Sequence, residues 1–371
     1  MKIAVVTSQA SSLLNFRGPL LTEMCKRGYE VLTFAPNIDE LTRNDLVAMG
    51  VTPIETSMSR SGLNPLRELA VIFELWRLLL KHKPDVCFAY FIKPVIYGAI
   101  AAWFARVPRR YGLIEGLGFA FTSTSSVDRR RERVQKAITL LSRFTLKRLN
   151  RVIFLNPDDR REFIERRLVD AEKTDLLGGI GLDLDAWSPV PPPKNEVTFI
   201  VVARLLRDKG ISEFAAAARL LRTDYPEARF VLLGGRDENP AAIPQADVDA
   251  WVAEGLIEWK GHVPSKPWFE KANIFVLPSY REGVPLSTQE AMALGRPVIT
   301  TDVPGCRETV INGRNGFMVP PRDPVALAAA MRHFLEQPED IATMGAESRK
   351  MAEEQFNVHA QNDKLLSFLG L

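Results

Sequence analysis

Short apolar segments that alternate with helical segments dominate this chain of 371 residues. Such an alternation builds parallel sheets whose two faces are covered by helices. The strands expected in the first half are Lys2–Thr7, Tyr29–Ala35, Val51–Glu55, Asp85–Tyr90, Arg110–Ile114 and Val152–Leu155. Those expected in the second half are Val197–Ala203, Arg229–Gly234, Glu258–Gly261, Ile274–Pro278 and Val298–Thr301. We therefore predict an α/β fold with doubly wound, Rossmann-like sheets.

A proline-rich segment at 188–194 interrupts the alternation. Consecutive prolines have no amide hydrogens to give to a helix or a sheet, so the segment is typical of a linker. It predicts a first domain over 1–187 and a second over 195–354, with a last helix in 355–371 packing back on the first. Two such domains leave a cleft, and ligands bind there at the carboxyl ends of the strands.

Cysteine usage and hydropathy indicate the compartment. The three cysteines and four histidines are scattered, which gives no support to a disulfide framework or a zinc cluster and fits a reducing compartment. The longest uncharged apolar stretch, Pro94–Ala105, is shorter than the roughly 20 residues of a spanning helix. No signal peptide is recognised. We expect a cytoplasmic protein.

The net charge of +3 hides an asymmetry, because residues 1–170 carry +10 and residues 171–371 carry −7. Such a basic half suits nucleic acid, anionic lipid or an anionic substrate. On a helix, five cations would share an arc of about 140° that also contains Leu140 and Phe144. These five are Arg133, Lys136, Arg143, Lys147 and Arg148. The pattern favours a helix resting on an anionic membrane, and the alternative is the solvated face of a core helix.

The most specific segment runs from Pro278 to Val298 and contains two acids. Glu282 is expected in a strand-to-helix loop and Glu290 one to two turns into the helix, so both carboxylates can reach one ligand. Free amides at the helix start would attract an anion. The alternative is a capping acid followed by a solvated one.

This segment resembles the E-x7-E signature of retaining glycosyltransferases with the GT-B fold, in which two Rossmann-like domains turn their parallel sheets toward a central cleft, and of family 4 in particular. Residues 203–210 resemble the family's "R…KG" segment and residues 231–235 its "GxG" strand end. Residues 260–263 resemble the element that faces the nucleotide base, and residues 178–183 resemble the stretch that enters the linker.

The resemblance implies a role for each matching residue. Arg204 and Lys209 would hold the donor diphosphate, Glu282 the sugar hydroxyls and Glu290 the ribose diol. Fixed cations near the departing diphosphate stabilise its growing charge, whereas the alternative for Arg204 and Lys209 is a surface pair. The other expected donor-binding residues are Asn15, Arg17, Gly18, Gly234, His262, Val263, Gly283, Val284, Pro285 and Leu286.

A narrower likeness rests on residues 15–19, 61–65, 115–118 and 234–240. Together they resemble enzymes that extend polyprenyl-diphosphate-linked saccharides, above all the α-1,3-N-acetylgalactosaminyltransferases of bacterial glycan assembly. Phe16 and Arg17 stand where many relatives have two glycines. Glu115 stands where many have a histidine, so we predict that its carboxylate contacts donor or acceptor hydroxyls. The alternative is an acid that caps the following turn.

The resemblance therefore implies a retaining, metal-independent hexosyltransferase without a cofactor. It would move a sugar, such as GalNAc, from a UDP-sugar to a polyprenyl-diphosphate-linked saccharide, as a peripheral protein on the inner face of the cell membrane. Two D-x-D triplets, at 183–185 and 247–249, match a metal motif only by letter.

Other functions remain open at this point. They are a capsule or O-antigen glycosyltransferase with another donor sugar, a GT-B nucleotide-sugar epimerase or phosphorylase, and a polyanion-binding protein. Such epimerases lack the E-x7-E arrangement, and phosphorylases are longer and need a pyridoxal lysine. No nucleic-acid-binding module accompanies the basic segment, so we expect no nucleic-acid partner.

Overall fold

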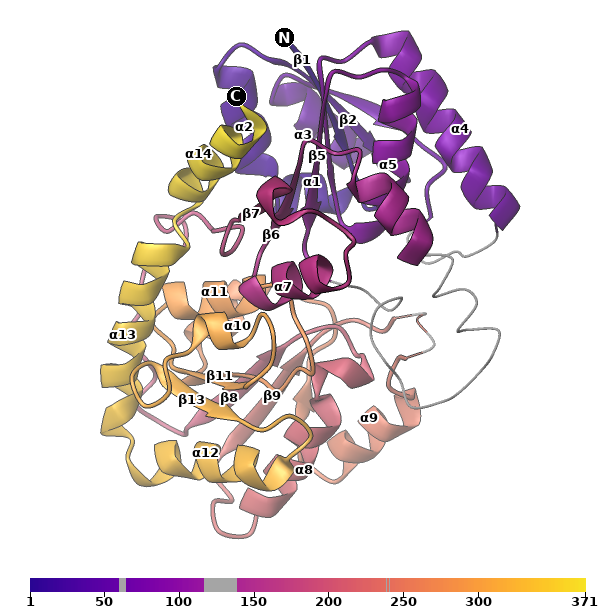
Figure 1. The fold of residues 1–371 in the computed structure, drawn as a ribbon. Coiled ribbons are helices and arrows are strands. Elements are labelled where there is room, and N and C mark those ends of the chain that lie inside the picture. Colours follow the sequence, from indigo (N-terminus) through magenta and orange to yellow (C-terminus); the bar gives the residue numbers. More distant parts are fainter. Residues whose placement is uncertain (60–64, 117–138, 238, 240) are drawn as a thin grey trace. The chain divides into compact units, whose positions relative to one another are not determined.

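A computed structural model describes residues 1–59, 65–116, 139–237, 239 and 241–371. They form two compact units, residues 1–178 with 359–371 and residues 179–358. Each unit contains one parallel sheet with helices around it (Figure 1). The predicted α/β class with two parallel sheets is confirmed. Among the described residues, no helix combines the length and the apolar character needed to cross a bilayer.

The sheet of the first unit has the strand order β3-β2-β1-β4-β5-β6-β7. Its strands are β1 (Lys2–Val6), β2 (Glu30–Ala35), β3 (Val51–Glu55), β4 (Val86–Tyr90), β5 (Arg109–Ile114), β6 (Arg151–Phe154) and β7 (Thr174–Leu176). Its helices are α1 (Ser11–Asn15), α2 (Gly18–Lys26), α3 (Glu40–Ala48), α4 (Pro65–His82), α5 (Ile92–Phe104), α7 (Pro157–Glu165), η1 (Ala171–Lys173) and α14 (Val358–Leu369). Residues 139–146 are also helical.

The central strands of this sheet are apolar on both faces. In β1 and β4 nearly every side chain is fully buried, because helices cover both sides of a doubly wound sheet. The order of the strands reverses between β1 and β4, and the carboxyl ends of such a pair are where α/β sheets bind ligands.

The sheet of the second unit has the order β10-β9-β8-β11-β12-β13 and reverses between β8 and β11. Its strands are β8 (Thr198–Val202), β9 (Arg229–Leu233), β10 (Glu258–Trp259), β11 (Ile274–Leu277), β12 (Val298–Thr301) and β13 (Gly316–Val319). Its helices are η2 (Arg207–Lys209), α8 (Ile211–Leu221), α9 (Gln245–Ala253), α10 (Lys266–Glu270), α11 (Leu286–Ala293), η3 (Arg307–Thr309), α12 (Pro324–Glu336) and α13 (Glu339–Gln355).

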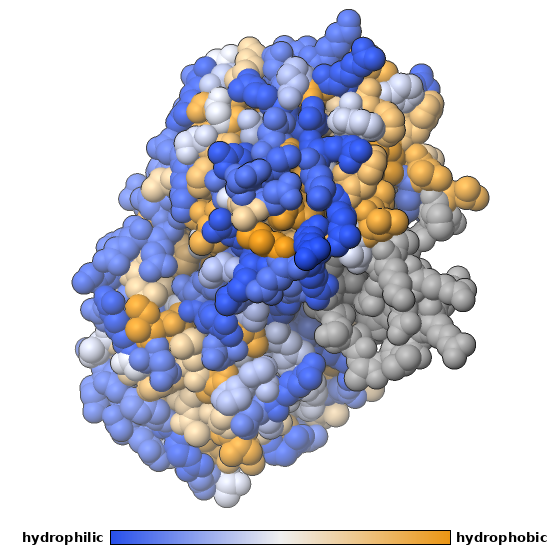
Figure 2. Space-filling model, viewed as in Figure 1, coloured by the Kyte–Doolittle hydropathy of each residue, from blue (hydrophilic) through white to orange (hydrophobic). Residues whose placement is uncertain are grey.

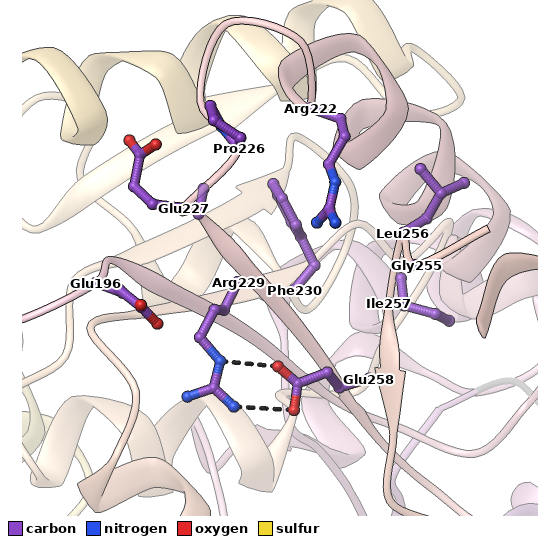
Figure 3. Close-up of a pocket in the computed structure, with 11 residues that line it drawn as sticks. Glu196, Arg222, Pro226, Glu227, Arg229, Phe230, Gly255, Leu256, Ile257 and Glu258 are labelled. Carbon is purple, nitrogen blue, oxygen red and sulfur yellow. Dashed lines mark hydrogen bonds and ion pairs between the residues drawn. The ribbon is translucent and has the colours of Figure 1, made fainter. Parts of the chain in front are cut away.

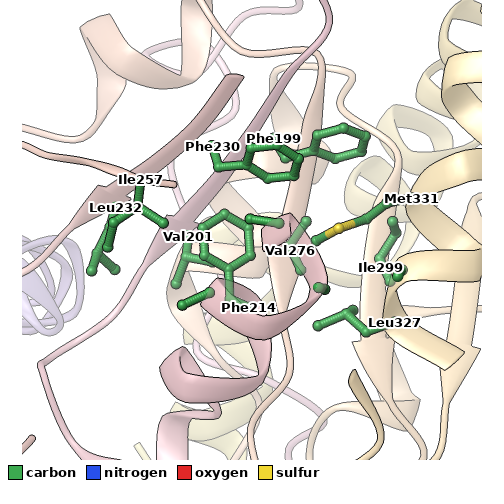
Figure 4. Close-up of a cluster of buried hydrophobic side chains, with 14 of the residues drawn as sticks. Phe199, Val201, Phe214, Phe230, Leu232, Ile257, Val276, Ile299, Leu327 and Met331 are labelled. Atoms are coloured by element: carbon green, nitrogen blue, oxygen red, sulfur yellow. The ribbon is translucent and has the colours of Figure 1, made fainter. Parts of the chain in front are cut away.

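Aromatic rings form the centre of the second core (Figure 4). Phe199 and Phe230 stack with their centroids 5.5 Å apart, and Phe214 of α8 meets Phe230 edge-on at 5.9 Å. These contacts fix α8 against β8 and β9, so the loop that precedes α8 is anchored at both ends.

The boundary between the units differs from the sequence-based expectation. Segment 188–194 lies within the second unit rather than between two domains. Its prolines donate no hydrogen bonds, but its carbonyls accept them: the oxygen of Val190 from Arg296 at 2.7 Å and that of Pro193 from Asn273 at 2.8 Å. The chain changes unit at Gly178–Gly179 instead, and it returns at 358–359 rather than 354–355.

Two strands were missed by the sequence pattern, β7 and β13. Neither contains a run of four apolar residues, because β7 reads Thr-Asp-Leu and β13 opens with a glycine. The last helix, α14, packs on the first unit, where Lys364 donates to the carbonyl of Leu177 at 2.8 Å.

Gly210, at the start of α8, permits a close backbone approach. Its φ is +67°, and a Cβ there would lie 2.0 Å from the carbonyl oxygen of Pro278.

We expect Gly210→Ala to lower the free energy of unfolding by at least about 3 kcal/mol, measured by urea titration. Gly313→Ala is the matched control, because φ is +76° there and the space is open. It should cost only about 1 kcal/mol. Equal losses would contradict the close approach.

Candidate functional site

Loops that follow β8, β11 and β12 meet at the carboxyl edge of the second sheet. The amide of Tyr280 donates to the carbonyl of Asp208 at 2.8 Å, and the amide of Glu282 to that of Pro304 at 3.0 Å. Because the strand order reverses between β8 and β11, these loops lie where α/β sheets bind ligands.

Lys209 and Glu282 form an ion pair at this edge. The Nζ of Lys209 lies 2.6 Å from Oε1 of Glu282, and only 14% and 13% of the two side chains are exposed. The hydroxyl of Ser279 donates to the same carboxylate oxygen at 2.7 Å. Hydrogen bonds between charged groups in a partly enclosed place are strong, so the carboxylate is fixed in direction. Both charged residues were predicted for the site, but their contact with each other was not.

The loop that carries Glu282 is held by residues that the sequence pattern missed. Ser279 is fully buried, and its carbonyl accepts a hydrogen bond from Thr301. Gly305 has a φ of +83°, and a Cβ there would lie 2.2 Å from the carbonyl oxygen of Glu282. Any larger residue would push this loop away from the sheet edge. The Pro304-Gly305 pair, separated by two residues from the end of a predicted strand, was the available signal.

Glu290 lies inside α11 and is partly buried. Its Oε2 accepts a hydrogen bond of 3.3 Å from Ser265. Burial raises the pKa of Glu290 to about 7, and the bond from Ser265 offsets this only in part. The helix begins after Pro285, which has no side-chain acceptor for the first amides, so the amides of Leu286 and Ser287 can receive an anion.

Three predicted segments of the second unit, residues 203–210, 231–237 and 260–263, contact one another through hydrogen bonds. Arg204 donates to Asp237 at 2.8 Å, and its side chain is 45% exposed. The amide of Gly234 donates to the carbonyl of Gly261 at 2.9 Å, and exposed His262 follows directly. The predicted Val263, Gly283 and Val284 are partly or fully buried in the adjoining loops.

In the first unit, Arg17 and Glu115 form a buried ion pair. Arg17 precedes α2 and Glu115 follows β5, and their side chains are 1% and 8% exposed. The guanidinium lies 5.0 Å from the ring centroid of Tyr90, a residue that was not predicted, and burial lowers the pKa of Arg17 to about 10. Two side chains predicted to face a ligand therefore contact each other here. Asn15 is exposed at the end of α1, and Gly18 opens α2.

The predicted basic face is described only in part. Arg133 and Lys136 lie outside the described residues. Arg143 donates to the carbonyls of Arg166 and Arg167 at 3.0 and 3.1 Å, and Lys147 is exposed. The guanidinium of Arg148 lies over Trp103 at 4.6 Å. Exposed Leu140 and Phe144 stand on the same helix, so this surface is both basic and apolar.

A cavity of about 240 Å³ lies at the opposite edge of the second sheet (Figure 3). Its wall includes the bidentate pair of Arg229 and Glu258, with bonds of 2.8 and 2.9 Å. Because Arg229 opens β9, this cavity lies at the amino ends of the strands and contains none of the predicted residues. Within the described part of the chain, no three His, Cys, Asp or Glu side chains gather as a metal site would require.

Two family models match the chain. Residues 18–178 match the glycosyl transferase 4-like domain, and residues 196–337 match the glycosyl transferases group 1. The chain belongs to these glycosyltransferases.

Similar proteins include two transferases of bacteria. The N,N'-diacetylbacillosaminyl-diphospho-undecaprenol α-1,3-N-acetylgalactosaminyltransferase of Campylobacter jejuni is 29% identical over 91% of this chain and 90% of its own. The UDP-Gal:α-D-GlcNAc-diphosphoundecaprenol α-1,3-galactosyltransferase of Escherichia coli is 29% identical over 70% of this chain and 68% of its own.

Solved structures share the fold of this glycosyltransferase. Sucrose-phosphate synthase from Thermosynechococcus elongatus has a TM-score of 0.80 at 20% identity and covers 98% of this chain and 97% of its own. Anabaena HepE in complex with UDP and glucose has a TM-score of 0.76 at 19% identity and covers 100% of this chain and 99% of its own. The predicted GT-B fold is confirmed.

The raised pKa of Glu290 makes the stability of this glycosyltransferase depend on pH. A carboxyl that titrates near 7 in the folded chain and near 4.5 in the unfolded chain holds its proton more tightly when folded. The contribution of this carboxyl to the free energy of unfolding is therefore full below pH 4.5 and is lost as the pH rises through 7. Glutamine does not titrate, so Glu290→Gln should not share this loss. From pH 5 to pH 8 the free energy of unfolding of the parent should fall by about 2 kcal/mol more than that of Glu290→Gln.

Urea titrations at both pH values measure this change. Glu347→Gln is the control, because Arg314 lowers the pKa of Glu347 and this acid does not titrate in that range. A stability difference between Glu290→Gln and the parent that stays constant with pH would contradict the burial of this carboxyl.

Proposed function

We propose that this glycosyltransferase moves an N-acetylhexosamine such as GalNAc from a UDP-sugar to a polyprenyl-diphosphate-linked saccharide, with retention of configuration. The observation that carries the proposal is the pair of Lys209 and Glu282, a cation and a carboxylate held 2.6 Å apart at the point where the strand order reverses. The names of the two bacterial relatives support the acceptor, and the UDP complex of HepE supports the donor.

Lys209 and Arg204 would bind the donor diphosphate. Each is held by one carboxylate in the structure, Glu282 and Asp237, and a diphosphate carries more negative charge than either. The donor would therefore take over these cations, while Ser279 keeps the carboxylate of Glu282 in place for the sugar hydroxyls. Because the cations neutralise the leaving group, the reaction would need no metal ion and no cofactor.

Retention would follow from attack on the same face that the diphosphate leaves. A phosphate oxygen of the donor would accept the proton of the acceptor hydroxyl as the bond to the sugar breaks. Glu282 would then orient the sugar rather than form a covalent bond with it. Glu290 would accept two hydrogen bonds from the ribose diol, and Glu115 would contact donor or acceptor hydroxyls.

The acceptor implies work at a membrane, since a polyprenyl tail stays in the bilayer. We propose that the enzyme acts as a peripheral protein on the inner face of the cell membrane. The exposed cations and apolar residues around 140–148 suit an anionic leaflet. Arg143, Lys147 and Arg148, with Arg133 and Lys136, would contribute the charge.

Glu282→Gln tests the proposal in a transfer assay with a panel of UDP-sugars and polyprenyl-diphosphate-linked saccharides. We expect at least about a hundredfold loss of kcat/KM, because the amide neither pairs with Lys209 nor accepts as strongly from a sugar hydroxyl. Glu347→Gln, at a half-buried acid of the same unit that pairs with Arg314, should match the parent. Activity of Glu282→Gln within about threefold of the parent, less than about 1 kcal/mol in barrier, would reject the assignment. An inverted anomeric product would reject retention.

A further inference from the structure

Helix α4 carries apolar residues on two opposite sides. One side belongs to the core of the first unit, where Val71, Leu75 and Leu79 are at most 1% exposed. The other side faces solvent. Its exposed large residues are Leu66 at 79%, Leu69 at 62%, Phe73 at 55% and Leu80 at 42%.

The outward residues form a continuous stripe. With half-buried Trp76, they follow one another at alternating steps of three and four residues, the spacing that keeps side chains on one face of a helix. The stripe spans about 21 Å from Leu66 to Leu80. The rings of Phe73 and Trp76 touch, with centroids 5.3 Å apart. In Figure 2, hydrophobic residues gather on the right-hand side of the first unit, where Figure 1 draws α4.

The charges around this stripe are mainly positive. Arg67, Arg77 and Lys81 are exposed on α4. The two acids of the helix are engaged elsewhere: Glu68 is buried and lies 2.9 Å from Nζ of Lys93, and Glu74 accepts from the amide of Ser57 at 3.0 Å. Among the described residues of α4, the fully exposed charged side chains are therefore all cations, while Glu74 is half-buried and bonded to Ser57.

We propose that the outward face of α4 docks on an anionic lipid bilayer, with Leu66, Leu69, Phe73 and Leu80 entering the boundary between headgroups and acyl chains. Apolar and aromatic residues flanked by arginine and lysine are what such a surface binds. The inference rests on the proposed function in so far as a membrane-embedded acceptor requires docking.

A second copy of the chain is the less suitable occupant of this face. If two copies of α4 packed along their stripes, Arg77 and Lys81 of one would meet cations of the other. The one acid near them, Glu74, is half-buried and already accepts a hydrogen bond from Ser57, so α4 lacks the exposed carboxylates that stabilise the interhelical positions of a coiled coil. A bilayer that contains anionic lipid satisfies both the apolar and the charged parts of this surface.

The same unit has a smaller surface of this kind, which supports the assignment. Trp103 and Phe104, at the end of α5, are 37% and 58% exposed, and the ring of Phe144 lies 6.0 Å from that of Trp103. The guanidinium of Arg148 lies over the ring of Trp103, and tryptophan and arginine side chains suit the headgroup layer of a bilayer. Helix α5 packs along α4, so both surfaces belong to the same layer of helices.

Vesicle sedimentation with the full chain tests the proposal. The vesicles contain phosphatidylcholine with about one third phosphatidylglycerol. We expect L69S/F73S to bind at least about tenfold more weakly than the parent, since two side chains that enter the bilayer become polar. The matched control L220S/V325S changes two exposed residues of the second unit, 49% and 66% exposed, and should bind like the parent. R77E/K81E should also weaken binding to these vesicles.

Transfer to a water-soluble acceptor with a short prenyl chain separates this inference from the proposed function. L69S/F73S should keep the activity of the parent on that acceptor and lose it on undecaprenyl-linked acceptor in vesicles. If L69S/F73S sediments like the parent, or if the parent does not sediment, the docking role of α4 is wrong whatever the activity. If the parent transfers no sugar to the soluble acceptor but L69S/F73S still fails to sediment, docking stands and the proposed function fails.

Discussion

Lys209 and Glu282 bring opposite charges within 2.6 Å of each other where less than one sixth of either side chain meets solvent. Each charge compensates the other, so removal of one leaves the other unpaired in a partly enclosed place. Ser279 donates a further hydrogen bond to the same carboxylate oxygen. The account of the site depends on this arrangement, because it keeps a cation and a carboxylate ready at one edge of the sheet until a ligand with more negative charge claims the cation.

Backbone contacts rather than side chains set the positions of this pair. Gly210 touches the carbonyl of Pro278, and Gly305 touches that of Glu282, so loops that follow three different strands lie against each other without Cβ atoms between them. The aromatic core under β8 and β9 holds the first turn of α8 through Phe214. A rigid sheet thus carries closely packed loops, and the charged groups at their tips have little freedom to move.

The sequence predicted the class of fold, most strands, and the placement of Glu282 in a loop and of Glu290 in the helix after it, because apolar periods and motif spacing are local properties. The sequence-based predictions differ from the structure where a contact between residues distant in the chain decides the local arrangement. The prolines of 188–194 suggested a linker, yet their carbonyls accept bonds within the second unit. The contact of Arg17 with Glu115 joins residues almost one hundred positions apart. The outward stripe of α4 was missed because its inward stripe alone explains an apolar helix.

Binding of UDP and of uridine to the parent and to Lys209→Ala tests the central claim most directly, by calorimetry at one pH and ionic strength. If the ammonium of Lys209 leaves Glu282 for the diphosphate, the substitution should weaken UDP binding at least about tenfold, more than 1 kcal/mol, and change uridine binding less than about twofold. Equal losses for both ligands, or an unchanged affinity for UDP, would contradict the claim that this pair receives the donor diphosphate.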